Sequence, residues 1–279
     1  MKAISYALFG LGHRYENCFD FNSYLRSMMI NVRLNRLIYP DWVMIVHINK
    51  QVYDEYKFLF DELAKSDKFE FKLCETDDLC KMMLWRMKPI FEIYMGKWKY
   101  SHVICRDLDS PTTYREAQAV QQWINNDKAA HAITDSISHT IPMLGGMIGF
   151  RPDYLSARTG WQSWKDMFEG KSYDFSVKGS DQDFLCREVY PKVAQMGSDS
   201  ITQHYVLGHA NTFLSDFHRE IPEGDNEDLK FTNQLCGHIG ASGYYSTPMD
   251  LFLKTTIEKF DDLVKIEENY KEIFYWIPK

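Results

Sequence analysis

The sequence lacks the features that place a protein across a membrane, in an oxidising compartment or on nucleic acid. None of its apolar runs approaches the roughly 20 residues that a bilayer-spanning helix needs. It contains no C-x-x-C pair and no N-x-S/T sequon. Acidic residues outnumber basic ones, 39 against 32, so the chain lacks the basic excess that is typical of nucleic-acid-binding domains.

Signals for export are also scarce. The first ten residues, MKAISYALFG, are too short for the core of a secretory signal, and no small-residue cleavage site follows them. The six cysteines match no zinc spacing, and two of them, Cys105 and Cys186, fall inside apolar runs, which favours small core residues with free thiols. We therefore expect a cytoplasmic protein with no transmembrane segment and no nucleic-acid partner.

The first hundred residues alternate between strand patterns and helix patterns. Helical spacing ends before Pro40 in one case and is interrupted at Pro89 in another. The alternation predicts a doubly wound α/β layer, in which ligands bind outside the carboxyl ends of the strands. Strand patterns lie at 3–9, 42–48, 69–73 and 102–105, and helix patterns lie at 22–38, 51–65 and 77–95.

The second half of the chain is less regular. Thr113 and Glu116 form a capping-box pattern at the start of one clear helix. The final stretch contains IFYWIP, which predicts either an aromatic plug in the core or an interfacial patch. Helices are predicted at 114–125, 181–190 and over most of 247–276, a strand at 131–134, and loops over most of 196–246.

Two carboxylates one residue apart, Asp107 and Asp109, directly follow the apolar run at 102–105. In an extended chain, residues i and i+2 point the same way, so both acids are expected to face one point. Adjacent carboxylates repel each other unless a cation lies nearby, and their hard oxygens suit Mg²⁺ or Mn²⁺. Such a cation at a strand end can hold a diphosphate and stabilise it as a leaving group. The plainer interpretation is a turn before the next helix.

Several other motifs follow one another in a characteristic order. They are VICRDLDS around the acid pair, LGGMIGF at 144–150, GSDQDFL at 179–185 and CGHIGASG at 236–243. In this order they resemble the nucleotide-sugar-dependent glycosyltransferases of the GT-A fold, and MLWRMKPIF at 83–91 resembles a segment of small viral and bacterial members. The resemblance covers residues 1–245.

For the fold, the resemblance implies an α/β structure of GT-A type, with a Rossmann-like mixed central sheet flanked by helices and an elaborated C-terminal half. The sequence has no internal repeats and no low-complexity linker, which favours one domain over 1–279. This domain would consist of a nucleotide-binding half at 1–110, an acceptor-binding half at 111–246 and a C-terminal helical extension at 247–279.

The resemblance also implies a metal site. Asp107 would contact the metal or the ribose of the donor, Asp109 would bind the metal, and His238 would be the third ligand, as in retaining galactosyltransferase-like enzymes. Oxygen and imidazole ligands together are compatible with Mn²⁺. Gly240 would let the backbone pass close to the phosphates. The lysine that follows in that family is absent, because Gly243 stands there. The alternative for His238 is a loop histidine between glycines.

The SDQD segment would lie below the donor sugar. By the same resemblance, Asp181 would bind sugar hydroxyls and Gln182 would face the anomeric carbon. An inverting enzyme would instead need a carboxylate base, for which Asp181 and Asp183 are the candidates. The alternative is structural, because Ser180 and Asp183 also form an S-x-x-D cap at a helix start.

Further residues are candidates for contacts with the donor. Arg86 and Lys88 precede the acid pair and would contact phosphate or sugar, although a solvated helix face explains them equally well. Arg106 is expected only to balance the charge of the acids. The nucleotide base is expected at the ends of the first two strands, near 47–49. The full set of expected donor-binding residues is Phe9, Gly10, Arg86, Asp107, Asp135, Gly145, Gly146 and Gly240.

The sequence therefore predicts a hexosyltransferase that uses Mn²⁺ or Mg²⁺ to move a sugar from a nucleotide diphosphate to a hydroxyl of a glycan or another acceptor. The D-Q pair and the late histidine favour retention. One alternative is a haloacid-dehalogenase-like phosphatase, although its D-x-D normally opens the chain. Another is a non-catalytic sugar-binding module. The sugar, the base, the acceptor and any contact of the aromatic C-terminus with a membrane surface stay open.

Overall fold

A computed structural model describes much of the chain. Three predicted site residues, Asp135, His238 and Gly240, lie outside the described residues, so their roles stay predictions. The described residues are 1–12, 20–75, 79–134, 141–168, 175, 177, 179–194, 201–205, 253 and 256–277.

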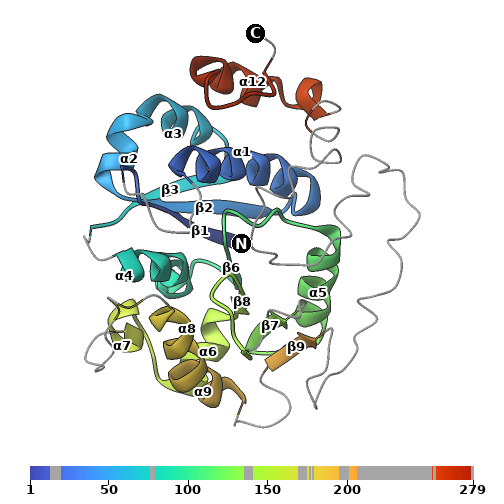
Figure 1. Ribbon diagram of the computed structural model, residues 1–279. Coiled ribbons are helices and arrows are strands. Elements are labelled where there is room, and N and C mark those ends of the chain that lie inside the picture. Colours follow the sequence, from blue (N-terminus) through green and yellow to red (C-terminus); the bar gives the residue numbers. More distant parts are fainter. Residues whose placement is uncertain are drawn as a thin grey trace.

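A seven-stranded mixed sheet forms the centre of the molecule (Figure 1). Its first four strands in space are mutually parallel, β8 runs antiparallel to both of its neighbours, and β7 and β9 are parallel to each other. This confirms the predicted α/β class with a mixed central sheet. The spatial order is β3 (Phe69–Leu73), β2 (Trp42–Ile48), β1 (Lys2–Leu8), β6 (His102–Arg106), β8 (Met147–Phe150), β7 (Ala130–Thr134) and β9 (Ile201–Tyr205).

The sequence of β2 explains why both of its faces are covered. All seven residues of WVMIVHI are buried, as expected for a parallel strand that is covered on both faces. Alternate residues of the neighbouring β1 serve the two faces: Ile4 and Tyr6 belong to one core cluster, whereas Ala3 belongs to the other. The sheet therefore separates two hydrophobic layers.

Helices cover both faces of the sheet (Figure 1). The first core cluster joins the sheet to α1 (Phe21–Ile38), α2 (Lys50–Glu55), α3 (Lys57–Leu63) and α5 (Tyr114–Asn125). The opposite face carries α4 (Leu79–Leu84), α6 (Pro152–Thr159), α7 (Trp164–Phe168), α8 (Ser180–Phe184) and α9 (Tyr190–Ala194). No described helix is long and apolar enough to cross a bilayer.

Side-chain caps fix the starts of the two longest helices. The side chain of Asp20 accepts a hydrogen bond from the N–H of Ser23 at 2.8 Å and begins α1. The hydroxyl of Thr113 accepts one from the N–H of Glu116 at 3.0 Å and begins α5, as its capping pattern predicted.

Several predicted helices are divided. The helix predicted at 51–65 breaks at Tyr56 into α2 and α3. The helix predicted at 77–95 is α4 followed by a 3-10 helix, η1 (Trp85–Phe91), which contains Pro89. Beyond it lies an unpredicted hairpin of β4 (Ile93–Tyr94) and β5 (Lys97–Trp98). The helix predicted at 181–190 is α8, the π-helical η2 (Leu185–Val189) and the start of α9. Strands β8 and β9 were not predicted as strands.

The C-terminal segment packs on the outside of the first helical layer (Figure 1). Its elements are η5 (Ile257–Phe260), α12 (Asp261–Glu267) and η6 (Glu268–Tyr270). Phe274 and Ile277 of the IFYWIP stretch are buried in the core cluster, so the plug is the alternative that the structure shows.

One buried ion pair joins this segment to α1. Arg33 pairs with Glu267, and both side chains are fully buried. The indole N–H of Trp276 also donates to Glu267, at 3.1 Å. The charge of Arg33 is therefore neutralised by a residue 234 positions later in the chain.

Candidate functional site

The acid pair directly follows the carboxyl end of β6, on the side of the sheet where the parallel strands end. Because β8 is antiparallel to β6, its first residues start at the edge where β6 ends, and Met147 pairs with Arg106. The chain that leaves β6 through Asp107 is therefore brought next to the chain that enters β8 through Gly145 and Gly146. The carboxyl edge of an α/β sheet is also where ligands commonly bind.

Arg86 of η1 connects two carboxylates from distant parts of the chain. Its guanidinium forms an ion pair with Asp107, and its Nη2 lies 3.5 Å from Oδ2 of Asp181 at the start of α8. The side chains of Arg86 and Asp181 are almost fully buried, whereas 45% of the Asp107 side chain is exposed. Burial works against the charge of Arg86, but Asp107 and Asp181 outweigh it and raise its pKa.

A hydrogen bond from a side chain of β6 to the main chain of η1 joins these two elements beside the ion pair. The Cys105 thiol in β6 donates to the carbonyl oxygen of Arg86, at 3.3 Å. Burial raises the pKa of this thiol to about 12, so it stays protonated and able to donate. The predicted role of Cys105 as a small core residue is confirmed, and its contact fixes the distance between η1 and the acid pair.

The glycine pair allows the backbone to approach these charged groups. A β-carbon at Gly146 would collide with the Asp107 carboxylate. A β-carbon at Gly145 would collide with the Arg86 guanidinium and would lie 3.2 Å from Oδ2 of Asp181. The neighbours that require glycine at both positions are the protein's own charged side chains. Contact of the glycines with a sugar stays a prediction.

We expect Gly146→Ala to damage the site and leave the fold intact. The added methyl group displaces the flexible end of Asp107, and the free energy of unfolding should change by less than about 1 kcal/mol. Mn²⁺ affinity, measured by calorimetry with a nucleoside diphosphate present, should fall about tenfold or more.

Gly149→Ala is the matched control for this variant. Its β-carbon would meet Ile104, His131 and Trp123 in the core at 2.9–3.0 Å. It should therefore lower stability without changing Mn²⁺ affinity. A Gly146→Ala protein that binds Mn²⁺ as the unaltered chain does would contradict the predicted crowding of Asp107.

Asp109 lies in a turn, so the expectation of an extended D-x-D segment is wrong. The N–H of Ser110 donates to the carbonyl oxygen of Asp107 at 3.3 Å and closes the turn. Burial, and then the charge of Asp107, raise the pKa of Asp109 to about 7. Burial also raises the pKa of Asp181, although Arg86 opposes this effect. Carboxyl groups perturbed in this way are common at functional sites.

A divalent cation fits the chemistry of the acid pair. A carboxyl group with a pKa near 7 is only partly ionised at neutral pH, and a cation beside Asp109 would favour its charged form. Within the described residues, no three His, Cys, Asp or Glu side chains come together as a ligand set. The predicted third ligand, His238, lies outside those residues.

The residues around Asp181 differ in exposure. Gln182 is partly buried, but Asp183 is exposed and pairs with Arg187 at 2.6 Å along the helix. The cap of α8 is Gly179, without a side-chain hydrogen bond, so the alternative in which Ser180 and Asp183 form a cap is wrong. Asp181 is therefore the carboxylate of this segment that faces Arg86.

Phe9 and Gly10 follow β1, which ends at Leu8, one residue before the predicted end of that strand. The Phe9 ring packs edge-on against Trp85, with 6.4 Å between the ring centroids. Trp85 is an aromatic residue beside the site that the sequence did not single out. Lys88 is 3.5 Å from the Cys74 sulfur, so in the structure this ammonium group has a partner within the protein.

The residues expected near the nucleotide base have partners within the protein. His47 is buried, its Nδ1 lies 3.0 Å from the carbonyl oxygen of Tyr6, and burial lowers its pKa to about 3. The side chain of Asn49 caps α2 by accepting from the N–H of Val52 at 2.9 Å. Their contact with a base stays a prediction.

Arg106 does not balance the acid pair. Its buried guanidinium donates to Glu116 at 2.8 Å and to the carbonyl oxygens of Cys105 and Ile148 at 2.8 and 2.9 Å. Arg106 therefore ties β6 to α5 and β8. The cation that meets Asp107 is Arg86, which comes from a separate element.

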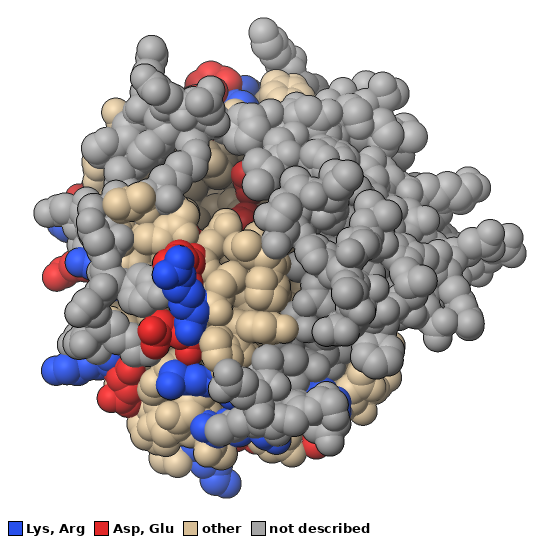
Figure 2. Space-filling view, turned by 60° about the horizontal axis from the view of Figure 1, so that its bottom comes forward, with Lys and Arg blue, Asp and Glu red and all other residues tan. Residues whose placement is uncertain are grey.

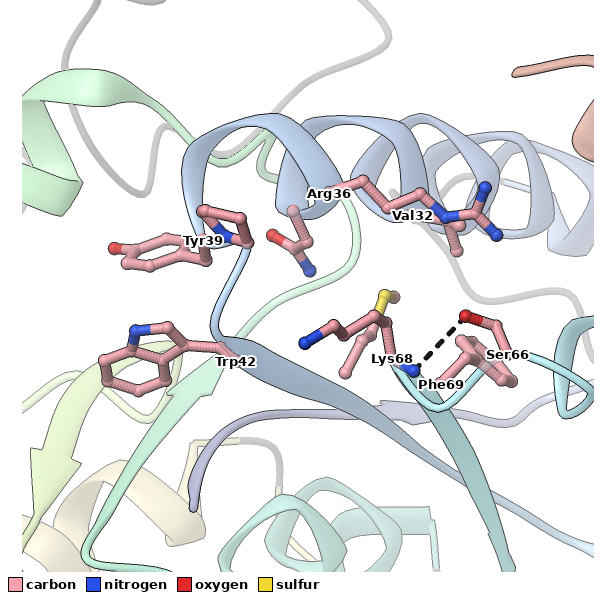
Figure 3. A pocket seen from close by; sticks show the side chains of 10 residues that line it. Val32, Arg36, Tyr39, Trp42, Ser66, Lys68 and Phe69 are labelled. Atoms are coloured by element: carbon pink, nitrogen blue, oxygen red, sulfur yellow. Dashed lines mark hydrogen bonds between the residues drawn. The ribbon is translucent and has the colours of Figure 1, made fainter. Parts of the chain in front are cut away.

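A cavity of about 380 Å³ lies elsewhere in the molecule (Figure 3). Its lining includes Tyr39, Trp42, Lys68 and Phe69, and two of these begin β2 and β3. It therefore opens at the amino ends of these strands, whereas Asp107 follows the carboxyl end of β6. In Figure 2, acidic atoms are visible in a hollow of the surface, and basic and acidic side chains lie side by side to the lower left of it.

The fold and the site define an α/β protein in which two neighbouring aspartates, Asp107 and Asp109, follow the C-terminal end of a parallel strand, β6. No protein-family profile matches the chain, and no curated protein matches it. Among solved structures, the chain is similar to 4-diphosphocytidyl-2C-methyl-D-erythritol synthase from Anaerococcus prevotii, at 14% identity and a TM-score of 0.43, over 83% of this chain and 93% of that chain. A similarity at this level carries no argument about substrate or reaction.

Proposed function

We propose that this protein is a Mn²⁺- or Mg²⁺-dependent glycosyltransferase that moves a sugar from a nucleotide diphosphate to an acceptor hydroxyl. The observation that carries the proposal is the meeting of Asp107, Asp109, Arg86 and Asp181 at one edge of the sheet. These residues come from three separate stretches of the chain. The contacts of Arg86 with Asp107 and Asp181 support the proposal that these residues belong to one site.

The charged groups have complementary roles in this proposal. Asp107 and Asp109 would hold the cation, and His238 would complete its ligands. When bound, the cation would neutralise the diphosphate leaving group. Arg86 is fixed by two carboxylates and adds a buried positive charge on the same side. A preorganised guanidinium suits the negative charge that develops as the bond to the sugar breaks.

Asp181 and Gln182 would act on the sugar in this proposal. Asp181 is buried against Arg86, and Gln182 follows it in the first turn of α8. In the retaining reaction that the D-Q pair favours, Asp181 would bind sugar hydroxyls and Gln182 would face the anomeric carbon. In an inverting reaction, Asp181 is a better base than Asp183, because Asp183 is exposed and paired with Arg187. Asp135 and Gly240 complete the proposed donor contacts.

The phosphatase alternative is less well supported by the site. Three strands of the main sheet, β1, β2 and β3, precede the acid pair in the chain. Asp107, which would be the nucleophile of a phosphatase, is engaged by Arg86. A non-catalytic sugar-binding module would keep the fold and would have no need of a cation.

The test is a screen of nucleotide diphosphate sugars for turnover. The protein should release nucleoside diphosphate from at least one of them when Mn²⁺ is present, and chelation of the metal should abolish the release. Turnover of p-nitrophenyl phosphate without any sugar nucleotide would favour the phosphatase. Calorimetric binding of a nucleoside diphosphate that is independent of Mn²⁺, with no turnover of any donor, would favour the binding module.

A further inference from the structure

A buried asparagine of α1 lies behind the turn that carries the two acids. The side-chain amide of Asn31 donates to the carbonyl oxygens of Leu108 and Ser110, at 3.0 and 3.4 Å. Its own oxygen accepts from the N–H and the hydroxyl of Thr112, at 3.0 and 3.2 Å. One side chain therefore contacts the main chain at three positions along 107–112.

The helix itself gains little from an asparagine at this position. Asn31 is fully buried in the interior of α1, where asparagine is a poorer helix former than leucine. An amide removed from water costs free energy unless it is hydrogen-bonded. All of the hydrogen bonds given above lead away from the helix and into the turn, which accounts for a polar side chain on an apolar face.

The contacts fix the part of the turn that aims Asp109. The two carbonyl groups that Asn31 binds belong to the residues on either side of Asp109. Holding both neighbours restricts the backbone rotations that set the direction of the Asp109 side chain. The bond from Ser110 to Asp107 closes the same turn.

We propose that Asn31 is a positioning residue that sets the acid pair for a divalent cation. This inference rests on the proposed metal-dependent function. Groups that orient metal ligands without touching the metal commonly change metal affinity by about 10–100-fold when they are removed. Asn31 acts through the main chain of the turn, so its loss should weaken cation binding more than it weakens the fold.

Asn35 provides a matched control one helical turn away. It is also buried, donates to the Tyr6 hydroxyl at 3.1 Å and accepts from the Thr112 hydroxyl at 2.9 Å. Neither of these hydrogen bonds goes to the main chain of 107–110. Replacing either asparagine with leucine leaves buried polar groups unpaired, so both variants should lose stability.

The experiment compares Asn31→Leu and Asn35→Leu with the unaltered chain. Free Mn²⁺ is titrated by electron paramagnetic resonance in the presence of uridine or guanosine diphosphate, and urea unfolding is followed in parallel. The dissociation constant for Mn²⁺ should rise about tenfold or more in Asn31→Leu. In Asn35→Leu it should rise by less than about threefold, with a comparable loss of stability.

The outcomes separate this inference from the proposed function. If the unaltered chain binds no Mn²⁺, both are overturned. If it binds Mn²⁺ and Asn31→Leu binds as well, or if both variants weaken equally, only the role of Asn31 is overturned. If Asn31→Leu does not fold, Asn31→Ser takes its place under the same criteria.

Discussion

The Asp109→Asn variant should be more stable than the unaltered protein in metal-free buffer, and it should be inactive. Burial and then the charge of Asp107 raise the pKa of Asp109 from 3.8 to about 7. A raised carboxyl pKa means that the folded state resists ionisation, so the charge opposes folding at neutral pH. Asparagine removes that charge, together with an oxygen ligand that the proposed cation needs.

The stability gain should depend on pH. Well below the ordinary pKa of 3.8 the carboxyl is protonated in both the folded and the unfolded state, so it has little effect on folding. The cost of ionisation grows between the ordinary pKa and the raised one, and it is complete above about pH 7. Because Asp109 is partly exposed, we expect the variant to gain on the order of 2 kcal/mol there, less than the full 1.4 kcal/mol per pKa unit.

Thermal unfolding with a chelator present, repeated at pH 4 and pH 8, measures this difference. Turnover of a sugar nucleotide with Mn²⁺ should fall about a hundredfold or more, because a bound metal contributes several kcal/mol to such reactions. Asp107→Asn is the control: it loses the ion pair with Arg86, so it should lose activity without gaining stability. If Asp109→Asn were less stable than the unaltered protein at pH 8, or had normal turnover, the assignment of Asp109 as a buried metal ligand would be contradicted.

Glu267→Gln should cause a large loss of stability. It leaves the Arg33 charge fully buried without its counter-ion, and removing one partner of such a pair costs about 3–5 kcal/mol. Glutamine also keeps only one acceptor oxygen, so it cannot accept from Arg33 and Trp276 as the two carboxylate oxygens do. The free energy of unfolding in urea measures the effect.

The exposed pair between Arg36 and Asp262 is the matched control, because it joins the same two elements. Their side chains are 20% and 59% exposed, so Asp262→Asn should cost at most about 1 kcal/mol. The double variant Arg33→Met with Glu267→Leu should recover much of the lost stability, because apolar residues can replace a buried pair. A Glu267→Gln protein as stable as Asp262→Asn would disprove the importance of the buried pair.

The elements that could be predicted are those whose pattern of apolar residues matches the faces that are buried in the structure. The run WVMIVHI is apolar throughout because β2 is covered on both faces, and its predicted bounds were correct. Strand β8 is only four residues long and contains a glycine. It is held by pairing with β6 and β7, which periodicity within one segment does not reveal.

The site could be predicted as separate motifs but not as an arrangement. Asp107, Gly146 and Asp181 were singled out from their neighbours in sequence. The link between them through Arg86 depends on how η1 and α8 pack on the edge of the sheet. Adjacency in sequence favoured Arg106 as the cation near the acids, but its side chain packs against α5.

The position of Asn31 has a signature in the sequence. Together with Asn35, it forms a pair of polar residues at i and i+4 on the apolar face of a long helix. Such residues are rarely buried unless something distant binds them. The sequence does not say what that partner is.

The ion pair between Arg33 and Glu267 has a consequence for how the protein is made. Ribosomes add about 5–20 residues per second, so Glu267 emerges roughly 10–50 s after Arg33. During that interval α1 carries a cation with no counter-ion on the side that the last helices later cover. The nascent chain can assemble its sheet, but its outer layer can close only after Glu267 has been added.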